Sequence, residues 1–161
     1  MNAEYRLSEH TTLEQFKALH SCLIDTSSLI YLNRLGVTAK LGSCLNLITI
    51  PEVAGEFGIL PDYIRLLTFD VSVSLVDKKL LACAIHFHWP VISEDRDLLK
   101  QLHKQGLPYF NTLMMLYFLL LKEMISPMDC RALQSQLKTF SRYGSTIWTY
   151  GQNLDRLIAK R

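Results

Sequence analysis

The stretch "CLIDTSSLIYL", residues 22–32, joins an apolar segment to an apolar helical pattern through a charged residue, Asp25. The apolar residues before Asp25 are typical of a short buried strand, and the pattern after it predicts a helix over about 27–35, which Gly36 can end. Asp25 could simply cap this helix, because Asp and Ser side chains accept hydrogen bonds from the amides of a first turn. Several acids in equivalent positions would instead bring carboxylates together at one edge of a sheet.

Short apolar segments alternate with helical patterns along the rest of the chain. Further strands are predicted at "LNLITI" (45–50), "PVIS" (90–93) and "LPYF" (107–110), and "TFDVSVSL" (68–75) is either a half-buried strand or a loop. The pattern predicts helices at "TTLEQFKALH" (11–20), "PEVAGEF" (51–57), "DKKLLACAIHFHW" (77–89), "RDLLKQLHKQG" (96–106), "NTLMMLYFLLLKEM" (111–124) and "SPMDCRALQSQLKTF" (126–140). Thr11 and Glu14 have the spacing of a capping box for the first of these helices. The alternation predicts an α/β fold, a three-layer α/β/α sandwich with a central parallel sheet of four to five strands.

The composition bounds the class of protein. With 161 residues, of which 49% are hydrophobic and 20% charged, the chain is expected to form a core without disulfides. The four cysteines are scattered without metal-ligand spacing, which indicates reduced thiols and a cytoplasmic protein. The longest strongly apolar stretch, "LMMLYFLLL" (113–121), is shorter than the ~20 residues that span a bilayer, so no membrane association is expected. A net charge of +2 does not by itself identify a polyanionic partner.

Acidic residues recur where the predicted strands end. Asp25 follows the first strand, Asp95 and Asp97 follow "PVIS", Asp77 begins the helix before that strand, and Glu56 lies on the helix after "LNLITI". Each could have a local role instead, as a helix cap or on a solvated helix face. The carboxyl ends of parallel strands meet at one edge of a sheet, however, so these acids are expected to converge there. Their repulsion would need a counter-ion, and hard divalent cations suit carboxylate ligands.

Four segments together resemble the PIN domain, the fold of metal-dependent ribonucleases that includes many bacterial toxins. They are "CLIDTSSLIYL", "IPEVAGEF", "LVDKKLLACAIHFHWPVISEDRDLL" and "KQGLPYFNTLMMLYFLLLKEMISPMD". The resemblance covers about residues 21–140, and its most specific part is the pairing of Asp77 with "ISEDR". It implies domain boundaries of 1–20 for a leading helical extension, 21–140 for the nuclease domain and 141–161 for a helical, aromatic tail packed on that domain.

The resemblance implies a role for each acid. Asp25, Glu56, Asp77 and Asp95 match the four acids of the family's site, and Asp97 matches an occasional fifth. The segment between Pro51 and Glu56 is about one residue short, so Glu52 competes with Glu56 for the second position. Thr26 and Ser93 match hydroxyl residues that orient the carboxylates or bound water.

The mechanism implied is hydrolysis of RNA phosphodiester bonds with one or two Mg²⁺ or Mn²⁺ ions held by the carboxylates. Five basic residues flank the acids in sequence and could hold the RNA phosphates, or could form ordinary solvated helix faces: Lys78, Lys79, Arg96, Lys100 and Lys104. Besides RNA, the resemblance implies an antitoxin protein as a partner. An exposed part of the apolar stripe around Met114 and Phe118 could form a homodimer face.

Other chemistries fit the sequence less well. Ser27 stands where a haloacid-dehalogenase phosphatase needs a second Asp, and no phosphate-binding GxxxxGK[ST] motif exists. His86 and His88 are two residues apart on a helix and point in different directions, which favours structural roles. The aromatic segment "RYGSTIWTYG" (142–151) is either a packing tail or a partner-binding segment. The main alternative to a nuclease is a non-catalytic PIN-like module that binds RNA or protein.

Overall fold

The computed structural model describes residues 7–73 and 75–161. Within them the chain forms two compact units, which we describe separately: His20–Thr112, and residues 7–19 together with Leu113–Arg161. The domain boundaries at residues 20 and 140 stay a prediction.

The unit His20–Thr112 is built on a parallel sheet of five strands in the order β3-β2-β1-β4-β5. The strands are β1 (Ser21–Ile24), β2 (Asn46–Thr49), β3 (Arg65–Leu66), β4 (Val91–Ile92) and β5 (Tyr109–Phe110). Leu23 lies opposite Ile48 on one side and Val91 on the other, and all three side chains are buried. The predicted α/β fold with a central parallel sheet is confirmed.

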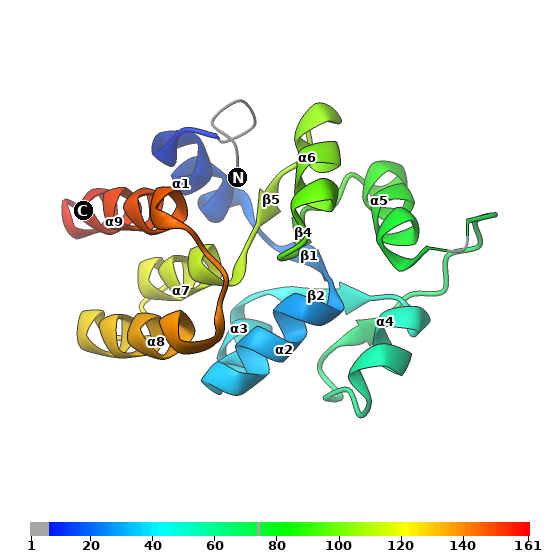
Figure 1. Cartoon of the computed structure of the whole chain (residues 1–161), viewed down its shortest axis with the longest axis horizontal. Helices are drawn as coiled ribbons and strands as arrows, with labels where there is room; N and C mark the ends of the chain where they lie inside the picture. Colours follow the sequence, from blue (N-terminus) through cyan, green and yellow to red (C-terminus); the bar gives the residue numbers. More distant parts are fainter. Residues whose placement is uncertain (1–6, 74) are drawn as a thin grey trace. The chain divides into compact units, whose positions relative to one another are not determined.

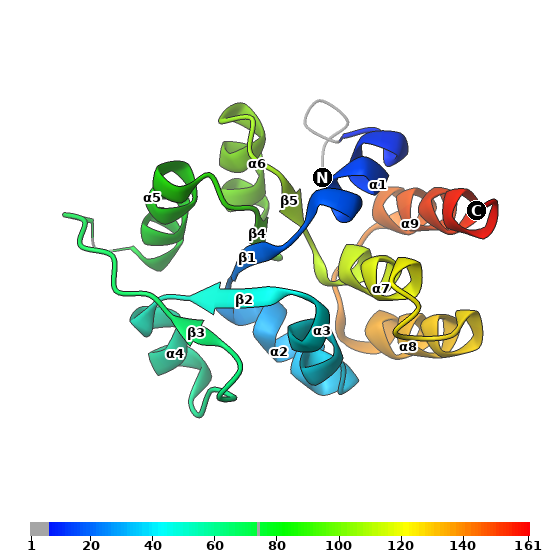
Figure 2. The same cartoon turned by 180° about the vertical axis from the view of Figure 1, so that it is seen from behind.

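The helices of this unit cover both faces of the sheet. They are α2 (Thr26–Leu35), α3 (Thr38–Cys44), α4 (Pro51–Phe57), α5 (Val76–Phe87) and α6 (Arg96–Lys104). The chain steps from β1 to β3 in one direction along the sheet and from β4 to β5 in the other. Right-handed crossovers therefore place α2–α4 on one face and α5 and α6 on the opposite face, as Figures 1 and 2 show.

Local sequence signals fix the ends of the helices next to the sheet. Asp25 is the N-cap of α2, and Gly36 ends that helix with φ +70°, a conformation that glycine adopts without steric cost. Pro51 occupies the first turn of α4, where its missing amide is not needed. Asp95 is the N-cap of α6. These positions hold the acids at the carboxyl ends of the strands.

Some local predictions are wrong or incomplete. The capping box of Thr11 and Glu14 does not form, because α1 (Glu9–Ala18) begins earlier, after Ser8, whose hydroxyl accepts a hydrogen bond from the Thr11 amide. Helix α3 was not predicted. Strand β3 lies at Arg65–Leu66, and within 68–75 the described residues form no strand.

The two histidines have the structural roles predicted for them. The His86 ring packs on the rings of Phe69 and Phe87, with centroids 5.2 and 4.6 Å away. His88 ends α5 with φ +56°.

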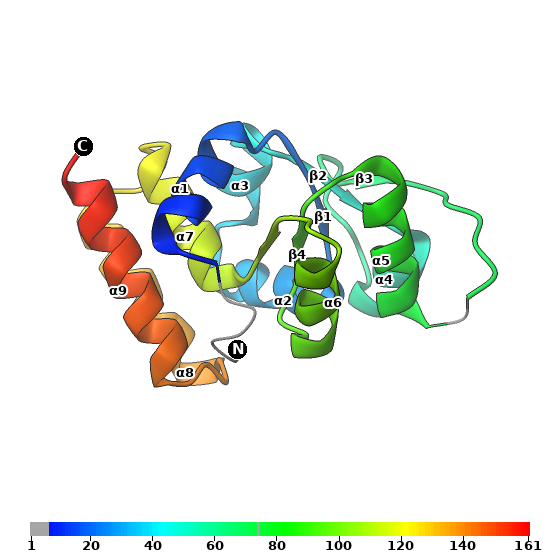
Figure 3. The same cartoon turned by 90° about the horizontal axis from the view of Figure 1, so that it is seen from above.

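The second unit is helical and contains α1, α8 (Pro127–Phe140), α9 (Ser145–Ala159) and most of α7 (Thr112–Leu121). Helix α9 lies beside α1 (Figures 1 and 3), and the buried hydroxyls of Thr12 and Tyr150 are hydrogen bonded to each other. A Cβ at Gly151 would come within 3.0 Å of the Leu113 and Tyr117 side chains, so α9 also approaches α7 closely. The segment after residue 141 is therefore a packed helix of this unit.

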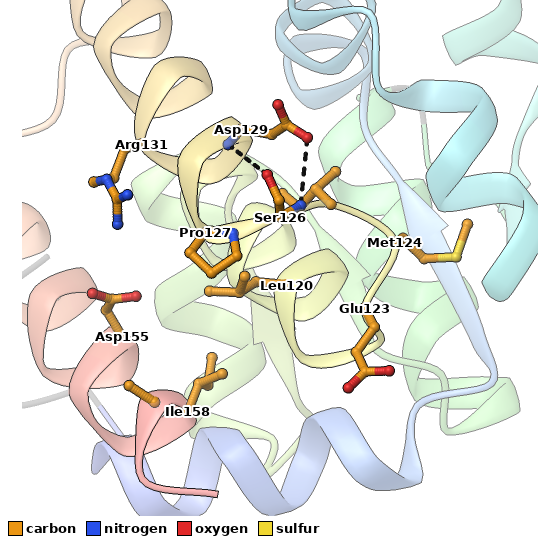
Figure 4. Close-up of a pocket in the computed structure, with 11 residues that line it drawn as sticks. Leu120, Glu123, Met124, Ser126, Pro127, Asp129, Arg131, Asp155 and Ile158 are labelled. Carbon is orange, nitrogen blue, oxygen red and sulfur yellow. Dashed lines mark hydrogen bonds between the residues drawn. The ribbon is translucent and has the colours of Figure 1, made fainter.

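A pocket opens in the helical unit where α7 ends, α8 begins and α9 ends (Figure 4). Leu120 and Ile158 contribute apolar surface to its lining. In the turn before α8, the Ser126 hydroxyl accepts a hydrogen bond from the Asp129 amide at 3.0 Å, and the Asp129 carboxylate accepts one from the Ser126 amide at 3.4 Å. This capping box fixes the start of α8. Among the described residues, no helix of either unit is long and apolar enough to cross a membrane.

Candidate active site

The candidate site lies where β1 and β4 run side by side and their connections leave to opposite faces of the sheet. Helix α2 follows β1 onto one face, and α6 follows β4 onto the other. A crevice forms outside the carboxyl ends of strands at such a point, and ligands of open α/β sheets bind there. Asp25 directly follows β1, and Ser93 directly follows β4.

The Asp25 carboxylate is held from both sides of this crevice. Its Oδ1 accepts a hydrogen bond from the Thr26 amide at 2.7 Å, and its Oδ2 accepts one from the Ser93 hydroxyl at 2.9 Å. The Asp25 amide also donates to the Ile92 carbonyl at 3.0 Å, which continues the pairing of β1 with β4. Asp25 therefore has a fixed orientation set by two strands that are distant in sequence.

The environment of Asp25 disfavours its charge. Burial raises the pKa of its carboxyl group, and the negative charges of Asp95 and Glu56 raise it further, while the hydrogen bonds from Ser93 and Thr26 lower it. The charges of Asp95 and Glu56 thus both act on the Asp25 carboxyl group. A cation bound there would relieve this repulsion.

The structure separates the two glutamates of α4. The Glu56 carboxylate accepts a hydrogen bond from the Thr26 hydroxyl at 2.7 Å, which brings it to the side of Asp25. Glu52 instead forms an ion pair with Lys79 at 2.7 Å, and this pair holds the pKa of Glu52 below its usual value. Of the two candidates for the second acidic position, Glu56 is the one hydrogen bonded to the residue that follows Asp25.

Asp95 joins the site through its backbone and its charge. The Asp95 amide donates to the Ser93 hydroxyl at 3.1 Å, and its Oδ1 caps α6 by accepting from the Leu98 amide at 3.0 Å. Asp97 is exposed in the first turn of α6. Ser93 thus connects the carboxylate of Asp25 with the turn that carries Asp95.

Asp77 is also at the carboxyl edge of the sheet, but its connection with Asp25 is indirect. It lies half-buried in the first turn of α5, and the ion pair between Lys79 and Glu52 joins that turn to the first turn of α4. No hydrogen bond or ion pair connects Asp77 with Asp25 within residues 7–73 and 75–161.

The five cations predicted to bind RNA differ in their exposure. Lys79 is half-buried and engaged with a glutamate. The other four are exposed, on the first turn of α5 and along α6: Lys78, Arg96, Lys100 and Lys104. Of these four exposed cations, Lys78 and Arg96 lie in the first turns of helices that begin at this edge.

One acid beside the candidate site, Glu94, is not identified by any sequence motif. Its carboxylate points inward and accepts hydrogen bonds from the Ser28 hydroxyl, from the Thr112 amide at 3.2 Å and from the Thr112 hydroxyl at 3.2 Å. Burial raises the pKa of Glu94 to about 7, against the lowering effect of these bonds, and Asp25 adds to the rise. Between Ser93 and Asp95, both of which match a motif, Glu94 carried no signal of its own.

The ligand chemistry of the site fits a hard divalent cation. Asp25, Asp95 and Glu56 offer only carboxylate oxygens, and the hydroxyls of Thr26 and Ser93 lie beside them. The described part of the chain contains no group of three or more His, Cys, Asp or Glu side chains arranged to hold a metal ion. Mg²⁺ commonly keeps several waters and uses one or two carboxylates together with substrate phosphates, so three protein ligands are not required.

Comparison with solved structures gives a structural likeness, whereas no protein-family model and no curated protein matches the chain. A solved structure of a PilT N-terminus domain protein, SSO1118, from the hyperthermophilic archaeon Sulfolobus solfataricus P2 is similar, with 12% sequence identity and a TM-score of 0.41 over 77% of this chain and 98% of that chain. The assignment of the site rests on the strand order and the carboxylate contacts.

Proposed function

We propose that this protein is a divalent-metal-dependent ribonuclease that hydrolyses RNA phosphodiester bonds at the carboxyl edge of its sheet. The observation that supports the proposal is the Asp25 carboxylate at the junction of β1 and β4, oriented by Ser93 and repelled by Asp95 and Glu56. A helix cap alone does not require two further acids beside it.

Each candidate site residue has a defined part in the proposed reaction. Asp25 and Asp95 would hold Mg²⁺ or Mn²⁺, with Glu56 acting directly or through water, and Asp77 and Asp97 are the outer candidates at the same edge. A metal held there would supply Lewis-acid activation of a water and stabilisation of the charge on the leaving oxygen. The hydroxyl of Ser93 keeps Asp25 oriented, and the hydroxyl of Thr26 does the same for Glu56.

The exposed cations of α5 and α6 are the proposed RNA contacts. Lys78 and Arg96 lie in the first turns of α5 and α6, and Lys100 and Lys104 follow along α6. Phosphate contacts of this kind would give affinity without sequence specificity. Lys79 would contribute less, because it is already paired with Glu52. An antitoxin partner stays a prediction of the sequence. Met114 and Phe118 are buried, so they do not provide the exposed homodimer face that the sequence suggested.

A non-catalytic PIN-like module that binds RNA or protein is the second candidate. The observation that favours it is that the described residues contain no preformed group of three metal-ligating side chains. The two candidates differ in metal binding, because a module without a site gains no stability from Mn²⁺.

The test is cleavage of a panel of single-stranded and structured RNAs by the purified protein. We expect cleavage with Mg²⁺ or Mn²⁺, its loss in excess chelator, and a loss of at least about a hundredfold in Asp25→Asn, which changes charge but hardly volume. Asp62→Asn, which changes an exposed acid outside the site, is the matched control. Cleavage that persists in chelator would exclude the metal mechanism, and RNA binding with neither cleavage nor a saturable Mn²⁺ effect would favour the module.

A further inference from the structure

Glu94 joins three parts of the chain that meet at the candidate site. It lies in the turn between β4 and α6, and its carboxylate accepts from Ser28 in the first turn of α2 and from Thr112, directly after β5. Ser28 and Thr112 are both fully buried. A buried polar contact with three donors is costly to break, because each donor left without its acceptor would cost about 1–3 kcal/mol.

The residues on either side of Glu94 are those that organise the acids. Ser93 donates to the Asp25 carboxylate and accepts from the Asp95 amide, and Asp95 begins α6. Asp25 and Ser28 belong to one helical turn, since Asp25 is the N-cap of α2. A bond from Glu94 to Ser28 therefore links the turn that carries Asp25 directly to the turn that carries Asp95.

We propose that Glu94 is a positioning residue: by holding Ser28 and Thr112, its carboxylate sets the relative position of Asp25 and Asp95. This inference rests on the proposed metal-dependent function, in which the spacing of these two acids determines the affinity for the ion. Outer groups that orient metal ligands typically contribute about 10- to 100-fold to metal affinity.

The chemistry of the contact indicates why a glutamate is suited to this role. The Ser28 hydroxyl, the Thr112 hydroxyl and the Thr112 amide all donate to it, so the acceptor must offer several lone pairs in one place. Glutamine keeps one carbonyl acceptor at the same distance from the backbone, and its amide group can donate to the Ser28 oxygen. Alanine keeps none of these contacts, so Glu94→Gln and Glu94→Ala separate the loss of the negative charge from the loss of the hydrogen bonds.

The experiment measures Mn²⁺ affinity at pH 7 in four variants of the full chain. Glu94→Ala is expected to weaken Mn²⁺ binding about 10- to 100-fold, and Glu94→Gln to restore most of that loss. Thr112→Val removes one of the bonds and should give a smaller loss. Thr12→Val is its matched control, because it also removes a hydroxyl hydrogen bond from a fully buried threonine, but in the helical unit, and it should leave Mn²⁺ affinity unchanged.

A second measurement does not depend on metal. Hydrogen exchange of the Thr26 amide, which is bonded to Asp25, and of the Asp95 amide, which is bonded to Ser93, reports the positions of the two acids in the metal-free protein. Both amides should exchange faster in Glu94→Ala and nearly normally in Glu94→Gln. If Glu94→Ala does not fold, Thr112→Val compared with Thr12→Val carries the same test.

The outcomes separate this inference from the proposed function. If the parent binds Mn²⁺ and Glu94→Ala binds it equally well, Glu94 is not a positioning residue and the nuclease proposal is untouched. If the parent binds no Mn²⁺, the nuclease proposal fails, and the exchange of the two amides decides the positioning role. Unchanged exchange of Thr26 and Asp95 in Glu94→Ala would then overturn it.

Discussion

Replacing Glu94 by glutamine should change how the stability of the metal-free protein depends on pH. Burial raises the pKa of Glu94, so between pH 4.5 and about 7 the folded protein keeps a proton that the unfolded chain releases. The free energy of unfolding therefore falls as the pH rises through this range. Glutamine does not titrate, and Glu94→Gln removes this loss.

The size of the effect follows from the two pKa values. The Glu94 pKa is about 7 in the folded protein, against an ordinary value of 4.5. At about 1.4 kcal/mol per pH unit, the whole shift corresponds to about 3 kcal/mol. An unfolded glutamate is already largely ionised at pH 5, so about 2–2.5 kcal/mol of the change develops between pH 5 and pH 8.

Urea unfolding of parent and variant at pH 5 and pH 8, in chelator, measures the difference. The stability of Glu94→Gln relative to the parent should increase by about 2–2.5 kcal/mol from pH 5 to pH 8, whatever the offset at pH 5. Glu123→Gln, at an exposed glutamate of the helical unit, removes one charge without a buried carboxylate and serves as the control. If parent and Glu94→Gln lose stability in parallel from pH 5 to pH 8, then Glu94 ionises normally and its carboxylate is not buried as described.

Asp95→Asn should stabilise the metal-free protein at pH 7 by up to about 1 kcal/mol, because it removes a like charge from the site while the amide oxygen still caps α6. The variant should also lose most of the thermal shift that Mn²⁺ gives the parent. Scanning calorimetry with chelator and with Mn²⁺ checks both expectations. Glu56→Gln should reduce single-turnover RNA cleavage more than Glu52→Gln, whose carboxylate is already paired with a lysine; the reverse order would give Glu52 the second acidic position. Lys100→Glu combined with Lys104→Glu should flatten the dependence of log Kd for RNA on log salt by about two units, and an unchanged slope would return both lysines to an ordinary solvated surface.

The part of the site that sequence could predict is the part encoded locally. Asp25 and Asp95 each stand between a buried strand and an apolar helix, so a strand, an N-cap and a helix can be identified within about ten residues. The parallel order of the sheet then brings the two ends together. The N-caps, the strands and the position of both acids at the edge of the sheet thus follow from the hydrophobic pattern and capping chemistry.

The rest depends on contacts between distant segments. Glu56 and Glu52 differ in their partners, Thr26 and Lys79, which lie on other helices, and no spacing within α4 encodes this difference. Glu94 is adjacent to a matched motif, but its burial results from Ser28 and Thr112, far away in sequence. Strand β3 has only two residues and both are exposed, so it forms through pairing with β2 and not through a hydrophobic pattern.

The two explanations of Asp25 and Asp95, helix cap and metal ligand, are compatible because a carboxylate has two oxygens. In each residue the Oδ1 atom accepts from an amide of the helix that follows, from Thr26 in one case and from Leu98 in the other. The cap therefore fixes the side chain with one oxygen and leaves the second for other partners, which for Asp25 include the Ser93 hydroxyl. Asparagine keeps the capping oxygen but loses the charge. Asp→Asn variants at these positions consequently preserve the helix starts, so a loss of Mn²⁺ binding in them cannot be attributed to a lost cap. In Asp25→Asn the Ser93 hydroxyl also loses its carboxylate acceptor, because the single amide oxygen is used by the cap.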